Sequence, residues 1–222
     1  MAEKLNQNFE IPLEQIEENI KQKINGNFIG YDLVVSPRDL VKVDDRVFMN
    51  AEVFESLIKN ISLRGTDHKL YSDASIKTYR REPKGFEIGQ NFVLEGKILG
   101  IMQNLEGKLF GGVIGISKMP AAQIYGEDSK GRKVVAFYVP PIVEIHGNLA
   151  VLIDGIHRSY ICSAAGTTTN AIHINNVSAD LPFDPISWKN CSLMPEKPPK
   201  NERYVNLDIS LFRDLTTVGI DG

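Results

Sequence analysis

The stretch LIDGIHRSYICSAAG, residues 152–166, places an apolar run, an Asp-Gly turn, a His-Arg pair and the start of a helix next to one another. The apolar run predicts a buried strand that ends at Asp154, and the segment after Gly155 has the pattern of a helix that Gly166 ends. A strand, a tight turn and a helix N-terminus together present unpaired backbone amides at the positive end of the helix dipole. The stretch therefore predicts an anion-binding turn.

The side chains of this turn suit a phosphate. Gly155 allows a sharp bend and a close approach to a ligand. Arg158 offers a planar fork to two oxygens, and His157 donates a hydrogen bond or moves a proton near neutral pH. Asp154 caps the helix, orients its neighbours, or holds a metal or a substrate hydroxyl. The predicted phosphate-binding set is Gly155, Ile156, His157, Arg158 and Ser159.

A structural interpretation of the same residues stays open. Asp-Gly is a common turn, Asp is an ordinary N-cap, and an Arg-His pair on a first helical turn can face water. Under the phosphate interpretation, Arg158→Ala costs about 1.5–3 kcal/mol of nucleotide affinity and leaves the melting temperature of the free protein nearly unchanged. A large loss of stability would favour the structural interpretation.

The flanking residues extend the pattern on both sides. PPIVEIHGNLAVLIDG, residues 140–155, predicts a hairpin with its turn at residues 146–148, and TTTNAIHINNV, residues 167–177, predicts another strand. Within the helix, the residues expected to face the core are Tyr160, Ile161 and Ala164.

Two more helices are expected before this region. Residues 10–27 carry Leu13, Ile16, Ile20 and Ile24 at helical spacing, with acids early and lysines late. Residues 51–63 follow Asn50 as a cap and precede Gly65 as a terminator. Their predicted core face is Val53, Phe54, Leu57, Ile58 and Ile61. Between the two, YDLVVSPRDL predicts a short strand that runs into a Pro-Arg turn.

Residues 85–145 have the pattern of glycine-punctuated strands. The runs NFVLEGKILGIM, KLFGGVIGI and KVVAFYVPPIVEI are rich in β-branched or aromatic residues. GGVIG lacks the following helix that a dinucleotide fingerprint needs. From Asp180 the chain is proline-rich and irregular, Trp188 is expected to anchor it on a neighbouring surface, and residues 208–219 are expected to form a last short helix.

Composition bounds the class of protein. The chain has 222 residues, a formal net charge of -3 and 42% hydrophobic residues, which is typical of a globular protein with a real core. We expect no membrane span, no secretory leader and a cytoplasmic location. Cys162 and Cys191 lie far apart without CxxC spacing, so we expect structural cysteines rather than a zinc or redox site.

LIDGIHRSYICSAAGTTTNAIHI resembles the DGxHR box of the ParB/sulfiredoxin superfamily, and PPIVEI resembles the Pro-Ile-Val strand before it. SPRDL and VFESLIKNISLRG are similar to the first half of that core. The resemblance implies an α/β (α+β) fold, a ParB/sulfiredoxin-like core with a β-rich insertion and an irregular C-terminal extension. The implied division is 1–65 for the N-terminal helices and first part of the core, 66–138 for the insertion, 139–179 for the phosphate-binding core and 180–222 for the extension.

The resemblance implies a nucleotide cradle for ATP, ADP or CTP, with Mg²⁺ as a further ligand. Sulfiredoxins carry a reactive Cys where this chain has Ile156, so their repair chemistry is not expected. Free-serine kinases are most similar at the motif and use an acid as general base, and the catalytic candidates are accordingly Asp154, His157 and Glu144. Asp154 and Glu127, beside Asp128, are the candidates for holding a metal.

Three classes of function stay open. The first is a nucleotide enzyme that transfers a phosphoryl group to a small molecule or hydrolyses the nucleotide. The second is a ParB-like nuclease or DNA-associated defence protein, which needs the cations of KTYRREPK, residues 77–84, near Arg158. The third is a nucleotide sensor or interaction module without catalysis. The oligomeric state does not follow from the sequence.

Overall fold

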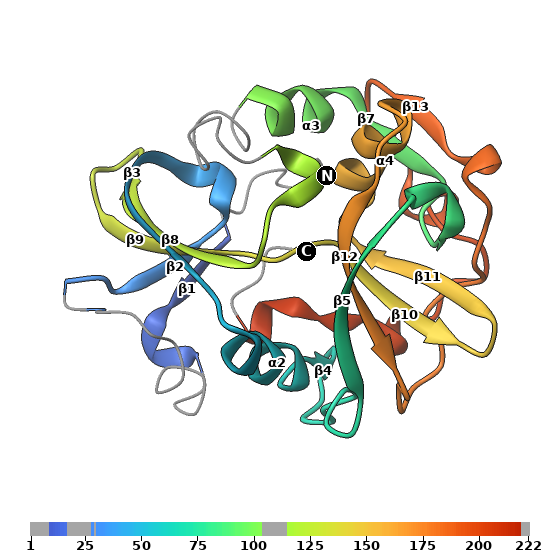
Figure 1. Cartoon of the computed structure of the whole chain (residues 1–222), viewed down its shortest axis with the longest axis horizontal. Helices are drawn as coiled ribbons and strands as arrows, with labels where there is room; N and C mark the ends of the chain where they lie inside the picture. Colours follow the sequence, from blue (N-terminus) through green and yellow to red (C-terminus); the bar gives the residue numbers. More distant parts are fainter. Residues whose placement is uncertain (1–8, 17–27, 29, 104–114, 219–222) are drawn as a thin grey trace.

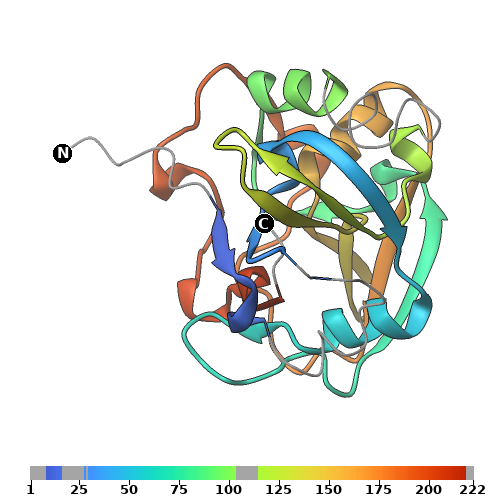
Figure 2. The ribbon, with the colours of Figure 1, turned by 90° about the vertical axis from the view of Figure 1, so that its left-hand side faces the viewer.

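Two mixed five-stranded sheets with three α-helices make up an α+β fold in this computed structural model, which describes residues 9–16, 28, 30–103 and 115–218 (Figure 1). The strand order is β1-β2-β9-β8-β3 in the first sheet and β5-β12-β10-β11-β6 in the second. The chain passes from the first sheet to the second between β3 and β5, returns between β6 and β8, and passes over again between β9 and β10, through residues 139–141. In Figure 2 the first sheet faces the viewer.

The first sheet consists of β1 Glu10–Pro12, β2 Leu33–Val35, β3 Leu40–Phe48, β8 Ala122–Asp128 and β9 Lys133–Tyr138. The second consists of β5 Ser75–Arg81, β6 Glu87–Ile88, β10 Ile142–His146, β11 Leu149–Asp154 and β12 Thr169–Asn175. Two short pairs are β7 Phe92–Leu94 with β13 Ser192–Met194, and β4 Ser62–Leu63 with β14 Arg213–Asp214. The α-helices are α2 Ala51–Lys59, α3 Glu95–Gly100 and α4 Ile156–Ala164.

Short 3-10 turns connect these elements. They are η1 Leu13–Gln15, η2 Pro37–Asp39, η3 Pro83–Gly85, η5 Ile116–Lys118, η6 Trp188–Asn190, η7 Lys200–Glu202, η8 Ile209–Leu211 and η9 Leu215–Val218. None of the helices in the described part of the chain has the length and apolar character that a membrane crossing demands.

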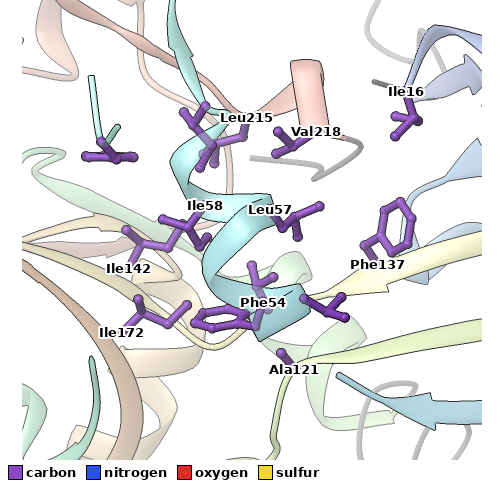
Figure 3. Packing of buried hydrophobic residues seen from close by; sticks show 14 of the residues in the cluster. Ile16, Phe54, Leu57, Ile58, Ala121, Phe137, Ile142, Ile172, Leu215 and Val218 are labelled. Atoms are coloured by element: carbon purple, nitrogen blue, oxygen red, sulfur yellow. The ribbon is translucent and has the colours of Figure 1, made fainter. Parts of the chain in front are cut away.

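The central core lies between the two sheets, and the buried face of α2 packs into it. Figure 3 shows Ile58 beside Ile142 and Phe54 beside Ile172, both partners being on the second sheet, and Leu57 turned toward Phe137 of the first. The α2 helix begins as predicted, because the Asn50 side chain accepts a hydrogen bond of 2.9 Å from the amide of Val53. Its predicted core face is buried at all positions, namely Val53, Phe54, Leu57, Ile58 and Ile61.

The second sheet contains the predicted hairpin. β10 and β11 pair antiparallel from Ile142↔Asp154 to His146↔Leu149, β12 lies parallel to β10, and α4 connects β11 to β12. The outer face of this sheet carries a second cluster of buried side chains, here called the outer cluster: Phe86, Ile88, Val143, Leu152 and Ala171. Ile156, at the start of α4, packs against this cluster.

Several predicted elements differ from the structure. Residues 10–12 form a strand and residues 13–15 a 3-10 turn instead of the start of a helix, because Glu10–Pro12 pairs with β2; residues 17–27 of that predicted helix lie outside the described residues. The predicted helix 51–63 ends at Lys59, since Ser62–Leu63 pairs with β14. The predicted strand 91–102 is a strand only over residues 92–94, after which α3 begins.

The end of the chain and the buried face of α4 also differ from expectation. Residues 209–218 form two 3-10 turns around β14 rather than one helix, because Arg213–Asp214 pairs with β4. On α4, Ser159 and Cys162 are buried, while Tyr160 and Ile161 are half-buried and Ala164 is exposed. The predicted strand KLFGGVIGI lies mostly outside the described residues, and its last residue, Ile116, begins η5.

The segment 66–138 supplies strands to both sheets. It gives β5 and β6 to the second sheet and β8 and β9 to the first. The extension after residue 180 runs back over the outer face, where Trp188 donates a hydrogen bond of 2.8 Å from Nε1 to the carbonyl of Pro83 and packs against the outer cluster. The anchor predicted at Trp188 is thus present, and it ties the extension to the second sheet.

Candidate functional site

The turn between β11 and α4 depends on the left-handed backbone of Gly155. β11 ends at Asp154, Gly155 has φ 88° and ψ 25°, and α4 begins at Ile156. A Cβ atom at Gly155 would lie 2.9 Å from the Cα of Pro141, which is closer than real contacts allow. Both the backbone angle and the space therefore demand glycine here.

Three backbone amides at the start of α4 point out of the helix without an acceptor. The first bond of this helix runs from the amide of Ser159 to the carbonyl of Gly155, at 2.9 Å. Among the described residues, the amides of Ile156, His157 and Arg158 donate to no carbonyl or side chain, and no side chain caps the helix. A left-handed residue followed by right-handed ones makes a concave group of amides of the kind that binds anions.

The guanidinium of Arg158 makes its contacts inside the protein. Its Nη2 donates to Oδ2 of Asp154 at 2.8 Å, and its Nη1 donates to the carbonyl of Val139. The guanidinium carbon lies 5.2 Å from the centre of the Tyr138 ring, and the side chain is 13% exposed. Arg158 thus ties the turn to the link between β9 and β10. Its Nη1 and Nη2 donors are directed into the protein.

His157 connects the starts of α3 and α4. Its Nε2 accepts a hydrogen bond of 3.1 Å from the amide of Leu94, the residue before α3. Burial, together with the positive charges of Lys97 and Arg158, lowers the pKa of His157 to about 4. The ring is therefore neutral at neutral pH and carries its proton on Nδ1, since Nε2 is the acceptor. Nδ1–H is then the hydrogen-bond donor of this ring.

Glu144 lies on the side of the second sheet opposite the outer cluster. Val143 packs in the outer cluster, so its neighbour Glu144 faces the central core. There its carboxylate, which is fully buried, accepts hydrogen bonds from Nη2 of Arg213 at 2.6 Å, from Nε2 of His146 at 2.7 Å and from the hydroxyl of Tyr71. The structure therefore does not bring Glu144 together with the turn that holds Asp154.

This buried cluster also sets the charge of Glu144. Burial acts to raise the pKa of the carboxyl, but the hydrogen bonds from His146, Arg213 and Tyr71 outweigh it and the pKa is lowered. Burial, helped by the carboxylate of Glu144, raises the pKa of the Tyr71 phenol well above its usual range. Glu144 is therefore a charged partner of the C-terminal segment in the folded protein.

The two residues predicted to hold a metal lie in different sheets. Glu127 is on β8 of the first sheet, where it contacts Lys42 at 3.2 Å and Lys133 at 2.9 Å. Asp154 is at the end of β11 in the second sheet, paired with Arg158. Within the residues that the structure describes, no three His, Cys, Asp or Glu side chains converge on a point that could hold a metal ion. Asp128 is bound by Arg132 at 2.6 Å.

Ser159 and the two cysteines occupy structural positions. Ser159 is fully buried, and its hydroxyl has no hydrogen-bond partner among the described residues. Cys162 is fully buried on α4, and Cys191 is half-buried against the outer cluster; neither forms a disulfide. Burial raises the pKa of the Cys191 thiol to about 11, so the thiolate is scarce at neutral pH.

The sequence did not point to the part of the site formed by α3. Leu94 provides the amide that holds His157, and Lys97 provides a positive charge close to that ring. Both belong to the stretch that was predicted as a strand, and no local signal links it to a helix about 60 residues later. The apolar residues Ile98 and Leu99 suit a strand as well as a short amphipathic helix.

A pocket of about 220 Å³ lies elsewhere, at the first sheet. Arg38, Asp128 and Lys130 are among its lining residues. Lys130 is paired with Glu10 at 3.0 Å and Asp128 with Arg132, so charges of both signs are balanced there. We therefore place the candidate site at the turn that precedes α4 and not at this pocket.

Comparisons of the chain with protein-family models, with curated proteins and with solved structures give no match. The candidate site is thus defined by its own geometry: a left-handed glycine, three outward amides, a neutral imidazole donor and a nearby lysine.

Proposed function

We propose that this protein binds the phosphates of a nucleotide, ATP, ADP or CTP, at the turn Asp154–Arg158. The observation that carries the proposal is the left-handed Gly155 directly before α4, which leaves the amides of Ile156, His157 and Arg158 without acceptors in the described part of the chain. The resemblance to the ParB/sulfiredoxin superfamily is part of the same proposal, because its DGxHR box falls on this turn.

The turn offers three kinds of contact to a phosphate. The backbone amides donate hydrogen bonds along the helix axis, where the dipole favours negative charge. The Nδ1–H group of His157 donates beside them, and its neutral state avoids a desolvated positive charge. Lys97 lies near enough to His157 to affect its pKa and supplies a compact positive charge for a second phosphate. Arg158 contributes by holding the turn in shape from inside.

The contacts favour binding over catalysis. The carboxylate of Glu144 is enclosed by Arg213, His146 and Tyr71 on the other side of the sheet, so it does not meet a ligand of the turn. His157 has a pKa of about 4 and is a weak base at neutral pH. Asp154 is the remaining acid, and one of its oxygens is bound by Arg158. We therefore propose a nucleotide sensor or binding module, and we treat phosphoryl transfer, hydrolysis and Mg²⁺ dependence as readouts of its test.

Calorimetric titration with ATP, ADP, CTP and GTP, with and without Mg²⁺, tests the proposal. We expect one of these nucleotides to bind at a single site and Lys97→Gln to weaken that nucleotide about tenfold or more, because a charge-assisted contact is lost. Lys59→Gln is the matched control: Lys59 is also a helical lysine, but α2 lies at the far side of the molecule from α3 and α4 (Figure 1). A nucleotide at a hundred times its Kd should also stabilise the protein by about 2.7 kcal/mol.

The same samples separate the alternatives. Phosphate release or transfer at the expense of the bound nucleotide would make the protein an enzyme and overturn the non-catalytic assignment. Cleavage of DNA, or binding of a short DNA with no nucleotide response, would favour the nuclease class. If no nucleotide binds, or if Lys59→Gln weakens binding as much as Lys97→Gln, the turn is a structural connection and the proposal is wrong.

A further inference from the structure

The outer edge of β5 is a separate feature of the second sheet, unrelated to the phosphate proposal. β5 spans Ser75–Arg81 and pairs over its full length with β12 on one side. It is the edge strand of the sheet, and it runs along one side of the molecule in Figure 2. Among the described residues, no backbone group of β5 bonds to a neighbour on its other side.

The alternation of the strands identifies which backbone groups are free. The amide of Ile172 on β12 donates to the carbonyl of Pro141, just before β10, so the odd-numbered residues of β12 direct their backbone groups to β5. Their partners on β5 include Lys77, Tyr79 and Arg81. The even-numbered residues between them, Ile76, Thr78 and Arg80, therefore point their amides and carbonyls outward.

The side chains along this edge are cationic and exposed. Lys77, Arg80, Arg81 and Lys84 lie within eight residues, all are exposed, and none of them forms an ion pair with another described residue. Arg80 uses its Nε for a hydrogen bond of 2.6 Å to Thr168, which leaves its terminal nitrogens for other acceptors.

An exposed aromatic ring lies between two of these cations. Tyr79 is 41% exposed, and the guanidinium carbon of Arg81 lies 5.7 Å from the centre of its ring. His173 supports the ring edge-on from the neighbouring strand, with the ring centres 5.1 Å apart. Lys77, Tyr79 and Arg81 share one face of the strand, because they alternate with Thr78 and Arg80. One face thus carries a cation, an aromatic ring and a cation at intervals of two residues.

We propose that the outer edge of β5 binds an extended acidic peptide, which adds to the second sheet as a further strand. A peptide strand matches the alternating amide and carbonyl groups of Ile76, Thr78 and Arg80, whereas nucleic-acid phosphates accept hydrogen bonds but donate none. The side chains specify its pattern: acid, any residue, apolar residue, any residue, acid. The two acids then lie opposite Lys77 and Arg81, and the apolar residue lies opposite Tyr79.

Charge argues against a second copy of this chain at the same edge. Two β5 strands paired antiparallel would bring Lys77 of one copy toward Arg81 of the other. Like charges directly opposite each other destabilise a sheet pair. Cations on an edge strand prevent such self-pairing, and the same cations attract a strand of opposite charge.

Fluorescence anisotropy with a labelled seven-residue peptide tests the proposal. The peptide has Glu at its second and sixth positions, Val at its fourth and Thr elsewhere. We expect saturable binding that weakens with salt and that is lost when alternate peptide amides are N-methylated on the edge facing β5. Labelled single-stranded oligothymidine is the competing probe. Tighter binding of the oligonucleotide than of the peptide would overturn the proposal in favour of a nucleic-acid surface.

Two variants locate the peptide on the chain. Thr78→Pro removes the central outward amide without removing a bond to β12, and edge strands accept proline at such positions. We expect it to weaken the peptide at least tenfold, while Thr78→Val, which keeps the amide, binds as the parent does. Lys77→Glu together with Arg81→Glu should abolish binding.

Hydrogen exchange followed by NMR reports on the same contact directly in the unmodified protein. Bound peptide should slow exchange at the amides of Ile76, Thr78 and Arg80, with no new protection at the start of α4. If these three amides exchange as fast with peptide as without it, strand addition at β5 is wrong, whatever the nucleotide titration shows.

Discussion

Arg213 and Glu144 form an ion pair inside the protein although 69 residues separate them along the chain. Two nitrogens of the guanidinium contact the two carboxylate oxygens at 2.6 and 2.7 Å, and the side chains are 1% and 0% exposed. Arg213 also donates to the carbonyls of Asp180 and Leu211. The pair joins β14, near the end of the chain, to β10 at the centre of the second sheet.

Removing one member of this pair should strongly destabilise the protein. Arg213→Met leaves the Glu144 carboxylate buried without its main positive partner, and we expect a loss of about 3–5 kcal/mol in the free energy of unfolding. The double variant Arg213→Met with Glu144→Leu removes both charges and should recover most of that loss. Urea unfolding followed by circular dichroism measures both values. A cost below about 1 kcal/mol for Arg213→Met would mean that the pair does not anchor the C-terminal segment.

The conformation of Gly155 gives a second prediction with a matched control. Gly155→Ala has to adopt φ 88° and brings its methyl group against Pro141. Gly131, in the turn between β8 and β9, has φ 73° and no atom within 4 Å of the point where a methyl group would lie, so Gly131→Ala carries the backbone cost alone. We expect about 1–2 kcal/mol for Gly131→Ala and at least about 1 kcal/mol more for Gly155→Ala. Equal losses of unfolding free energy for the two variants would mean that the backbone near Pro141 moves to accommodate the methyl group without cost.

The elements around the DGxHR stretch could be predicted because their signals are local. The alternation in residues 142–146 and 149–154, the turn between them and the glycines at both ends of α4 fix a hairpin and a helix without help from distant residues. The start of α2 was predictable for the same reason, since Asn50 and the spacing of Phe54, Leu57 and Ile58 lie within one short segment.

The elements that prediction missed depend on distant partners. Residues 10–12 are a strand because β2 pairs with them, and residues 213–214 are a strand because β4 does; neither pairing leaves a mark in the local pattern. In the candidate site, the loop was predictable, but the direction of Arg158 was not. Its acceptor, the carbonyl of Val139, is a backbone group 19 residues earlier, and any residue type would supply it.

The inward contacts of Arg158 replace the expectation that its loss leaves the free protein unchanged. Arg158→Ala removes the donors to Val139 and Asp154 in a half-buried setting, and each unsatisfied group costs about 1–3 kcal/mol. We therefore expect a loss of at least about 2 kcal/mol in urea unfolding without ligand. Arg80→Ala is the control, because Arg80 is exposed and should cost less than about 0.5 kcal/mol. An unchanged stability for Arg158→Ala would mean that these contacts do not stabilise the free protein, and it would favour a direct contact between Arg158 and the ligand.

The depressed pKa of His157 predicts how stability depends on pH. The unfolded chain protonates this imidazole near its ordinary value of 6.5, whereas burial, with the charges of Lys97 and Arg158, lowers the pKa to about 4 in the folded protein. Between these two values the unfolded state binds one more proton, so stability falls as the pH is lowered from about 6.5 to about 4, and this group adds no pH dependence above or below that window. The full effect is about 3 kcal/mol at most.

His157→Gln isolates this contribution, because the amide oxygen of glutamine can still accept from Leu94 and does not titrate. We expect the free energy of unfolding of the parent protein to fall more steeply than that of the variant between about pH 6.5 and about pH 4.5, with parallel curves above about pH 7. Urea unfolding at half-unit intervals of pH measures the difference, and other titrating groups, Glu144 included, cancel because both proteins contain them. Parallel curves throughout would mean that His157 titrates normally in the folded protein, so that at mildly acidic pH both ring nitrogens would carry protons and Nε2 could no longer accept from Leu94.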